Sequence, residues 1–280
     1  MKQHVEPSWL KDRLNDGHIR VVDCRFNLGN PDSGRLEYQR SHIPGAVYFD
    51  LEEDLSGPVR EHGGRHPLPD LEELKAKLEK AGIENDSVLV AYDAKEGAFS
   101  SRFWWIMNYI GHEQVYILDG GLEAWREEGF LEDSLIPDYP PSSYTISVKS
   151  EMVASYEEVR DIALNGKEGT ILIDSREEKR FLGEEEPIDR IPGHIPAAIN
   201  KPWMEGFKNG RFKSKEEQVK RFSGISKDLS LIVYCGSGVT ATPNYIALKE
   251  AGYENVKLYT GSYSDWVSYE HNPVSKGKEG

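Results

Sequence analysis

The 280-residue chain contains two cysteines, and one of them stands where a thiol can do chemistry. Cys235 follows an apolar run and opens a glycine-rich loop, Cys-Gly-Ser-Gly-Val-Thr-Ala, which precedes a helical pattern. Backbone N–H groups and the N-terminus of a helix stabilise a thiolate, which is the nucleophilic form of cysteine. We therefore predict that Cys235 is a nucleophile. Cys24 lies inside an Asp-x-Arg segment and is predicted to be structural.

The loop after Cys235 has the composition of an anion-binding nest. Its two glycines allow the chain to curl tightly, so that successive backbone N–H groups point at one anion. The nest is predicted to consist of Gly236, Ser237, Gly238, Val239 and Thr240. A cysteine-dependent phosphatase needs an arginine at the end of such a loop, to grip the phosphate oxygens, and this chain has Ala241 there. A cysteine hydrolase needs an oxyanion hole beside an acyl pocket, and the sequence gives little support for one.

The second half of the chain repeats the plan of the first. Four segments recur in the same order: Arg20–Arg25 with Ile171–Arg176, Ser41–Ala46 with Gly193–Ala198, Val88–Asp93 with Leu231–Cys235, and Tyr116–Gly120 with Val256–Gly261. We predict two domains, 1–132 and 151–280, joined by a proline-rich linker over 133–150. Short apolar runs that alternate with helical patterns favour an α/β class: two tandem three-layer domains, each with a mostly parallel central sheet between helices.

The two copies differ where chemistry is expected. Reactive groups in parallel α/β sheets gather at the carboxyl ends of strands. At the matching strand end the first copy has Asp93 and the second has Cys235. A carboxylate cannot replace a thiolate as the nucleophile, so the first copy is predicted to be catalytically silent.

Composition excludes several other classes. The net charge of −14, without a basic stripe, argues against nucleic-acid binding. The apolar runs are far shorter than the roughly 20 residues of a membrane helix, the N-terminus lacks an apolar signal segment, and two cysteines cannot form a disulfide framework. We expect a cytoplasmic protein. His62 and His66 flank Gly63–Arg65 without ligand spacing, so neither a metal nor a cofactor is predicted.

Taken together, the tandem copies, the Asp-x-Arg and Gly-His-Ile-Pro segments and the Cys235 loop resemble the two-domain rhodanese sulfurtransferases. The loop is most similar to the branch of that family that uses 3-mercaptopyruvate. The resemblance implies a double displacement through a Cys235 persulfide, with 3-mercaptopyruvate and secondarily thiosulfate as sulfur donors. The implied acceptor is a small thiol, a thioredoxin-like protein or cyanide.

The resemblance also implies roles for individual residues. Arg180, in an Arg-Phe-x-Gly segment, matches the family's arginine for the donor carboxylate, and Arg190 is the candidate for a second one. His42 is expected to act on Ser237 in a catalytic relay, with Asp32 orienting the histidine ring. His194 occupies the position equivalent to His42 in the second copy, where a structural role is expected.

Two alternatives stay open at this point. The chain could be a thiosulfate sulfurtransferase that passes sulfur to cyanide. It could also be a persulfide carrier or redox-sensing protein, in which Cys235 accepts sulfur from a partner without turnover of a small molecule.

Overall fold

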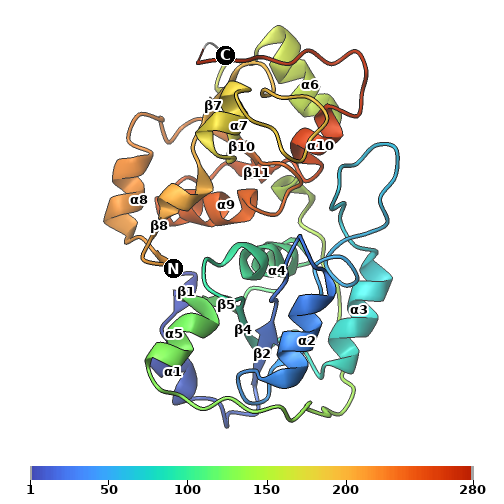
Figure 1. Cartoon of the computed structure of the whole chain (residues 1–280), viewed down its shortest axis with the longest axis vertical. Helices are drawn as coiled ribbons and strands as arrows, with labels where there is room; N and C mark the ends of the chain where they lie inside the picture. Colours follow the sequence, from blue (N-terminus) through green and yellow to red (C-terminus); the bar gives the residue numbers. More distant parts are fainter. Residues whose placement is uncertain (1, 279–280) are drawn as a thin grey trace. The chain divides into compact units, whose positions relative to one another are not determined.

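The computed structural model describes residues 2–278, which divide into two compact units (Figure 1). The first unit contains the chain up to Gly57, Leu68–Lys149 and Lys208–Phe212. The second contains Pro58–Pro67, Ser150–Phe207 and the chain from Lys213. Residues 58–67 therefore cluster with the second unit although they belong to the first sequence repeat. The predicted linker packs on the first unit up to Lys149. The domain limits 1–132 and 151–280 stay a prediction.

The first unit is a parallel five-stranded sheet, in the order β1-β5-β4-β2-β3, flanked by helices (Figure 1). In chain order its elements are β1 (His4–Val5), α1 (Pro7–Lys11), β2 (Ile19–Asp23), α2 (Asp32–Arg40), β3 (Val47–Tyr48), α3 (Leu71–Lys80), β4 (Val88–Tyr92), α4 (Ala98–Tyr109), β5 (Val115–Leu118) and α5 (Gly121–Glu127). The central strand β4 is an apolar run, as expected of a parallel strand covered on both faces.

The second unit repeats this plan with the order β11-β10-β6-β7, also parallel. Its elements are η1 (Ser150–Met152), α6 (Tyr156–Asn165), β6 (Thr170–Asp174), α7 (Glu178–Leu182), β7 (Ala198–Asn200), η2 (Trp203–Gly206), α8 (Lys215–Arg221), β10 (Ser230–Tyr234), α9 (Ala241–Glu250), β11 (Val256–Leu258) and α10 (Ser262–Trp266). The short strands β8 (Phe207–Lys208) and β9 (Arg211–Phe212) pair with each other. The predicted α/β class with tandem, mostly parallel sheets is confirmed.

Each unit has its own apolar core. The first is centred on Trp125 and the second on Trp266, and both indole rings are fully buried. Helix starts follow local chemistry: the Ser155 hydroxyl accepts a hydrogen bond from Glu158 N at 3.2 Å and caps α6. Two independent cores explain why the chain forms two compact units.

The Asp-x-Arg segments form the same buried ion pair twice. Arg25 Nη2 lies 2.6 Å from Asp23 Oδ2, and Arg176 Nη2 lies 2.6 Å from Asp174 Oδ2. Each guanidinium also donates to a backbone carbonyl at the start of the His-Ile-Pro segment, at 2.7 Å in both units. Both pairs are almost completely buried. Each ion pair thus joins the end of a sheet strand to the start of the His-Ile-Pro segment.

The histidines of the His-Ile-Pro segments are also equivalent. His42 Nδ1 lies 2.6 Å from Tyr38 O, and His194 Nδ1 lies 2.7 Å from Phe181 O. Each imidazole stacks on the aromatic ring of the same residue, and each is fully buried. Burial lowers the pKa of His194 and thus favours its neutral form. Both histidines hold local structure.

Removal of one member of a buried ion pair should be costly. We expect Arg176→Met to lower the free energy of unfolding by about 3–5 kcal/mol, because it leaves the Asp174 carboxylate buried without its partner. Urea unfolding followed by tryptophan fluorescence measures this. Lys179→Met is the control, since its ion pair with Glu185 is more than half exposed and should contribute much less. Equal shifts of the urea midpoint for both variants would contradict the prediction.

Candidate active site

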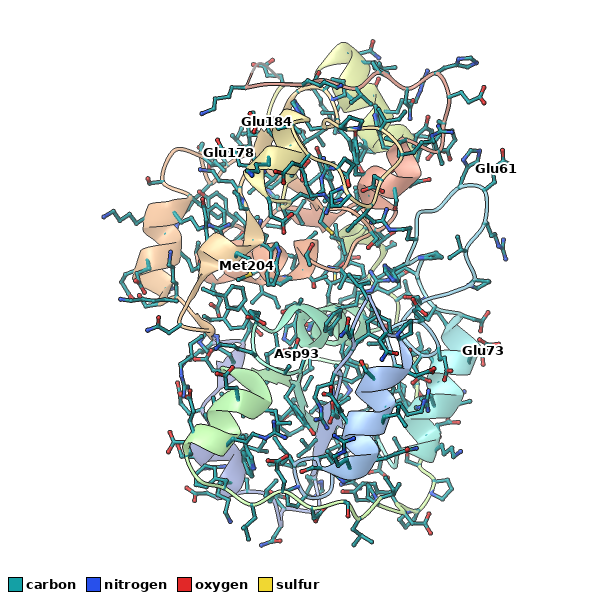
Figure 2. All side chains as sticks on the ribbon, viewed as in Figure 1. Glu61, Glu73, Asp93, Glu178, Glu184 and Met204 are labelled. Atoms are coloured by element: carbon teal, nitrogen blue, oxygen red, sulfur yellow. The ribbon has the colours of Figure 1, made fainter. Side chains whose placement is uncertain are left out.

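In the first unit, Asp93 (labelled in Figure 2) directly follows β4, and the loop after it turns its backbone toward the Asp93 carboxylate. The backbone N–H groups that donate to this carboxylate, at 2.9–3.2 Å, belong to Lys95, Gly97, Phe99 and Ser100. Burial raises the pKa of Asp93, while these hydrogen bonds oppose the change. The first nest is therefore built for an anion and is filled by a side chain of the loop itself.

The second unit places Cys235 at the same point, directly after β10. Its backbone makes the same kind of hydrogen bond as in the first unit. Cys235 O accepts from Tyr263 N at 2.9 Å, and Asp93 O accepts from Leu122 N at 2.9 Å. Gly238 N donates to the Cys235 Sγ atom at 3.2 Å. The thiol group of cysteine has one heavy atom where the carboxylate of aspartate has three. The same type of loop can therefore receive a sulfur atom together with a further anionic group.

Gly238 is required by the shape of this loop. Its φ is +77°, which side chains rarely adopt, and a methyl group in place of its hydrogen would lie 2.3 Å from Thr260 O. Helix α9 begins at Ala241, just after the loop, and so adds its N-terminal end to the nest. The nest residues named from the sequence thus follow one another from Cys235 to the helix start.

Cys24 is the structural cysteine. Burial raises the pKa of its thiol, and the nearby Asp23 carboxylate raises it further, so the thiol stays protonated. Its backbone N–H donates to Tyr92 O at 2.7 Å, and that of its counterpart Ser175 donates to Tyr234 O at 2.8 Å. The backbone of Cys24 therefore continues the hydrogen-bonded pairing with the central strand β4.

Ser237 is paired with a histidine that the sequence analysis did not select. Its Oγ lies 2.8 Å from Nδ1 of His66, and both residues are buried. His66 belongs to residues 58–67, which pack within the second unit: Gly63 N donates to Asp265 Oδ1 at 2.7 Å, and Arg65 N donates to Ser264 Oγ at 3.1 Å. The buried Ser–His pair can move a proton next to the Cys235 loop.

The structure gives the His42 ring other partners, so the role of His42 as the partner of Ser237 stays a prediction. Its ring nitrogens lie 2.6 Å from Tyr38 O and 3.2 Å from Leu135 O, inside the first unit. Asp32 does not orient that ring either, because it is an exposed residue at the start of α2. The signal for His66 was present in the sequence. The segment around Gly63–Arg65 carries two histidines and an arginine, and Lys208–Phe212 at the matching place of the second copy clusters with the first unit in the same way.

Two arginines border the Cys235 loop. A methyl group built on Gly236 would lie 2.9 Å from Arg65 Nη2 and 3.4 Å from Arg180 Nη2. Arg180 is the arginine that the sequence indicated for the donor. Arg65 was not selected, and it takes the place next to the loop that a second anion-binding arginine would need. Arg190 instead donates to Val267 O at 2.5 Å.

Both arginines are held by buried carboxylates. Glu186 accepts from Arg176 Nη1 at 3.1 Å and from Arg180 Nη2 at 2.8 Å. Asp189 accepts from Arg180 Nη2 at 2.9 Å and also from Arg65 Nη1. Burial acts to raise the pKa of Glu186, but hydrogen bonds from Arg180 and from backbone N–H groups lower it on balance. For Asp189 burial prevails, and its pKa is raised in spite of the two arginines.

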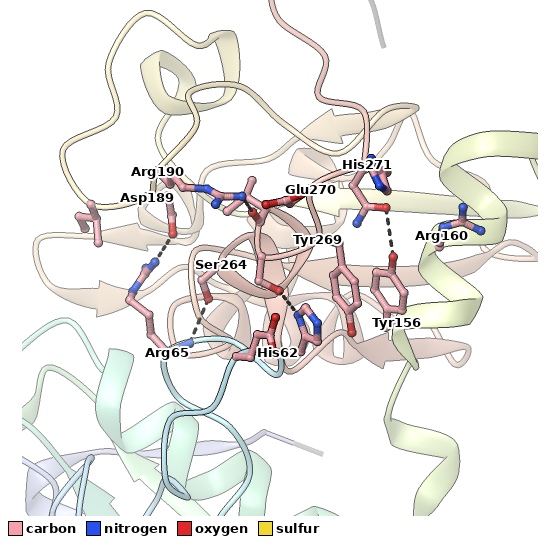
Figure 3. Close-up of a pocket in the computed structure, with 15 residues that line it drawn as sticks. His62, Arg65, Tyr156, Arg160, Asp189, Arg190, Ser264, Tyr269, Glu270 and His271 are labelled. Atoms are coloured by element: carbon pink, nitrogen blue, oxygen red, sulfur yellow. Dashed lines mark hydrogen bonds and ion pairs between the residues drawn. The ribbon is translucent and has the colours of Figure 1, made fainter.

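A cavity of about 820 Å³ lies beside these residues (Figure 3). Its charged lining is mixed: Arg65, Arg160 and Arg190 with Glu61, Asp189 and Glu270. Near one end, the rings of His62, Tyr269 and Tyr156 stack in series, with centroids 3.9 Å apart at both steps. Because Arg65 and Asp189 line the cavity and also lie next to Gly236, the cavity and the Cys235 loop share these two side chains as neighbours.

Within residues 2–278, no helix combines the length and apolar character needed to cross a membrane. In the same residues, histidine, cysteine and acidic side chains nowhere gather in groups of three or more that could hold a metal ion.

Comparisons with known proteins agree with this arrangement. The sequence profile of the Rhodanese-like domain family matches residues 6–128 and 156–269. A probable 3-mercaptopyruvate sulfurtransferase from Pseudomonas aeruginosa is 40% identical over 96% of both chains. The sulfur carrier protein TtuD from Thermus thermophilus is 32% identical over 98% of this chain and 97% of its own. The crystal structure of the 3-mercaptopyruvate sulfotransferase SseA from Escherichia coli superposes with a TM-score of 0.84 at 33% identity, covering 94% of this chain and 100% of SseA.

The chain therefore belongs to the rhodanese family and carries the domain twice, as the sequence predicted.

The shape of the Cys235 loop can be tested without any substrate. We expect Gly238→Ala to slow alkylation of Cys235 by iodoacetamide about tenfold, because strain of about 1–3 kcal/mol displaces the N–H group that donates to the sulfur. Peptide mass mapping measures the rate. Gly224→Ala is the control, since a methyl group there meets no atom within 4 Å. Equal rates in the two variants would show that the tight turn does not support the thiolate.

Proposed function

We propose that the chain transfers sulfur from 3-mercaptopyruvate, and secondarily from thiosulfate, to a thiol, a thioredoxin-like protein or cyanide. The chain is a sulfurtransferase, and the proposal specifies its substrates and its residues. One observation carries it: Cys235 occupies, in the second nest, the position that an aspartate fills in the first. A nucleophilic sulfur thus replaces a built-in anion at the end of the central strand.

In the proposed first half-reaction, the Cys235 thiolate attacks the sulfur of 3-mercaptopyruvate. The new S–S bond forms as the donor's C–S bond breaks, and the electron pair of that bond passes to the carbon as the enolate of pyruvate. A proton then converts the enolate into pyruvate. We propose that His66 and Ser237, which contact each other, polarise the donor carbonyl and supply that proton. The converging N–H groups of the loop stabilise the persulfide left on Cys235.

In the second half-reaction, the acceptor thiolate attacks the outer sulfur of the persulfide. The S–S bond to Cys235 breaks, its electron pair returns to Cys235 as a thiolate, and the acceptor leaves with the sulfur. Arg180 and Arg65 are proposed to bind the donor carboxylate, since a guanidinium fork suits that group better than an ammonium. Arg190 lines the approach cavity, where it is proposed to attract the anion. We place the reaction in the cytoplasm and assign it no cofactor.

A second candidate is supported by one comparison. The similarity to a protein named as a sulfur carrier favours a chain that receives sulfur and passes it to a partner without small-molecule turnover. Steady-state kinetics separate the two. Turnover of 3-mercaptopyruvate with a small thiol supports the enzyme, and absence of turnover with either donor supports the carrier.

The persulfide can be observed directly. After incubation with 3-mercaptopyruvate without an acceptor, we expect the intact mass of the protein to increase by one sulfur atom. The increase should be lost in Cys235→Ser and should persist in Cys24→Ser, the matched control, because the Cys24 thiol stays protonated in the core. A sulfur adduct that survives in Cys235→Ser would rule out Cys235 as the carrier of the persulfide.

The two histidines can be separated in the same assay. We expect His66→Ala to lower kcat/KM at least about 100-fold through loss of proton transfer, with little change in the urea midpoint. His42→Ala should lower the free energy of unfolding by about 1–3 kcal/mol, because it leaves a buried carbonyl unpaired, while the folded variant keeps most of its kcat/KM. The reverse pattern would restore His42 as the relay residue.

A further inference from the structure

Asp189 stands between the two arginines that the donor needs. Its side chain is 2% exposed, and it accepts hydrogen bonds from Arg180 Nη2 at 2.9 Å and from Arg65 Nη1. Asp189 Oδ2 would lie 3.6 Å from a methyl group on Gly236, close to both guanidinium groups. Figure 3 shows the Asp189 carboxylate joined to Arg65 at the side of the cavity. A carboxylate thus already occupies the anion position beside the Cys235 loop.

An incoming donor meets a series of buried charges that cancel. Arg176, Arg180 and Arg65 contribute three positive charges, and Asp174, Glu186 and Asp189 contribute three negative ones, in an alternating series of contacts. The series is neutral, so the two arginines at its end exert little net attraction on an anion. The overall charge of −14 adds no attraction for an anion. A donor carboxylate therefore binds these arginines only if one of the internal carboxylates moves away from them.

Among these carboxylates, Asp189 is the one that can move away from its arginine partners. Glu186 is fixed from two sides by Arg176 and Arg180, and it also accepts hydrogen bonds from Asp189 N at 2.9 Å and Ile188 N at 3.1 Å. The Asp189 carboxylate is held by the two arginines that border the loop, and it lines the cavity through which an anion would approach. Its burial raises its pKa, which indicates that the charged form is poorly stabilised there.

We propose that Asp189 is an internal substitute for the donor carboxylate, and that its exchange for the donor on Arg65 and Arg180 sets the selectivity of Cys235 toward anionic reagents. Asp189 is thus a selectivity-determining residue that acts through the arginines. The exchange replaces one carboxylate by another on the same cations, so it keeps the pair of guanidiniums neutralised in both states. The physiological meaning of this step rests on the proposed function, whereas the charge selectivity of Cys235 does not.

The selectivity can be measured with two alkylating reagents of nearly the same size. Iodoacetate carries a carboxylate and iodoacetamide is neutral, and both react with a thiolate. The quantity measured is the ratio of their rate constants at Cys235, obtained by peptide mass mapping. A purely structural role of Asp189 would change both rates together and leave the ratio constant. A role in anion selectivity changes the ratio.

We expect Asp189→Asn to raise the iodoacetate-to-iodoacetamide ratio about tenfold, because it removes the charge that neutralises Arg65 and Arg180. Asp189→Ser is a second neutral variant in case the first fails to fold. The matched control is Glu184→Gln, which removes an exposed negative charge from the same segment (Figure 2) and should leave the ratio unchanged. An unchanged ratio in a folded Asp189 variant, or an equal rise in Glu184→Gln, would overturn the proposal.

The donor provides the second measurement. In Asp189→Asn, half-maximal persulfide formation should need about tenfold less 3-mercaptopyruvate than in the unmodified protein. If the unmodified protein forms no persulfide, the proposed function fails, and the alkylation ratio still tests the role of Asp189. If it forms the persulfide and the half-maximal concentration does not fall in Asp189→Asn, the inference about Asp189 fails alone.

Discussion

A loop directly after a central parallel strand, which turns backbone N–H toward the side chain at its start, is the constraint that both units share. In the first unit those groups hold the Asp93 carboxylate, and in the second Gly238 N points at the Cys235 sulfur. The strand supplies a rigid base and the following helix adds its N-terminal end. Because the backbone provides the donors, the nest survives a change of the side chain at its centre. Chemistry could therefore differ between two copies that share one fold.

Much of this arrangement could be predicted from residue order alone. Repeated segments predicted two tandem domains, which the family match confirms, and the exchange of Asp93 for Cys235 predicts which copy is reactive. Both features lie within continuous stretches of sequence. His66 and Arg65 were missed because their role depends on where residues 58–67 pack, which apolar periodicity does not determine. The sequence also could not separate His42 from His194, which occupies the equivalent position. Their Nδ1 atoms make equivalent hydrogen bonds, to Tyr38 O and Phe181 O.

The buried ions of the second unit form a continuous path from the sheet to the site. Asp174 is the last residue of β6 and forms an ion pair with Arg176. Glu186 forms ion pairs with both Arg176 and Arg180 and so links the two arginines. A buried ion pair by itself is weak evidence for stability, since desolvation offsets much of the attraction. Here the alternating series does something else: it fixes the planes of the guanidinium groups that face the loop. Glu186 and Asp189, from the acidic stretch before His194, therefore belong to the surroundings of the Cys235 loop.

Residues 58–67 have a consequence for the independence of the two repeats. They are encoded in the first repeat, yet they fold with the second and bring it the imidazole beside Ser237. A gene shortened to the second repeat would encode Cys235 without that imidazole. The second repeat is therefore not a self-sufficient module, because its Cys235 loop lies next to a segment that only the first repeat encodes.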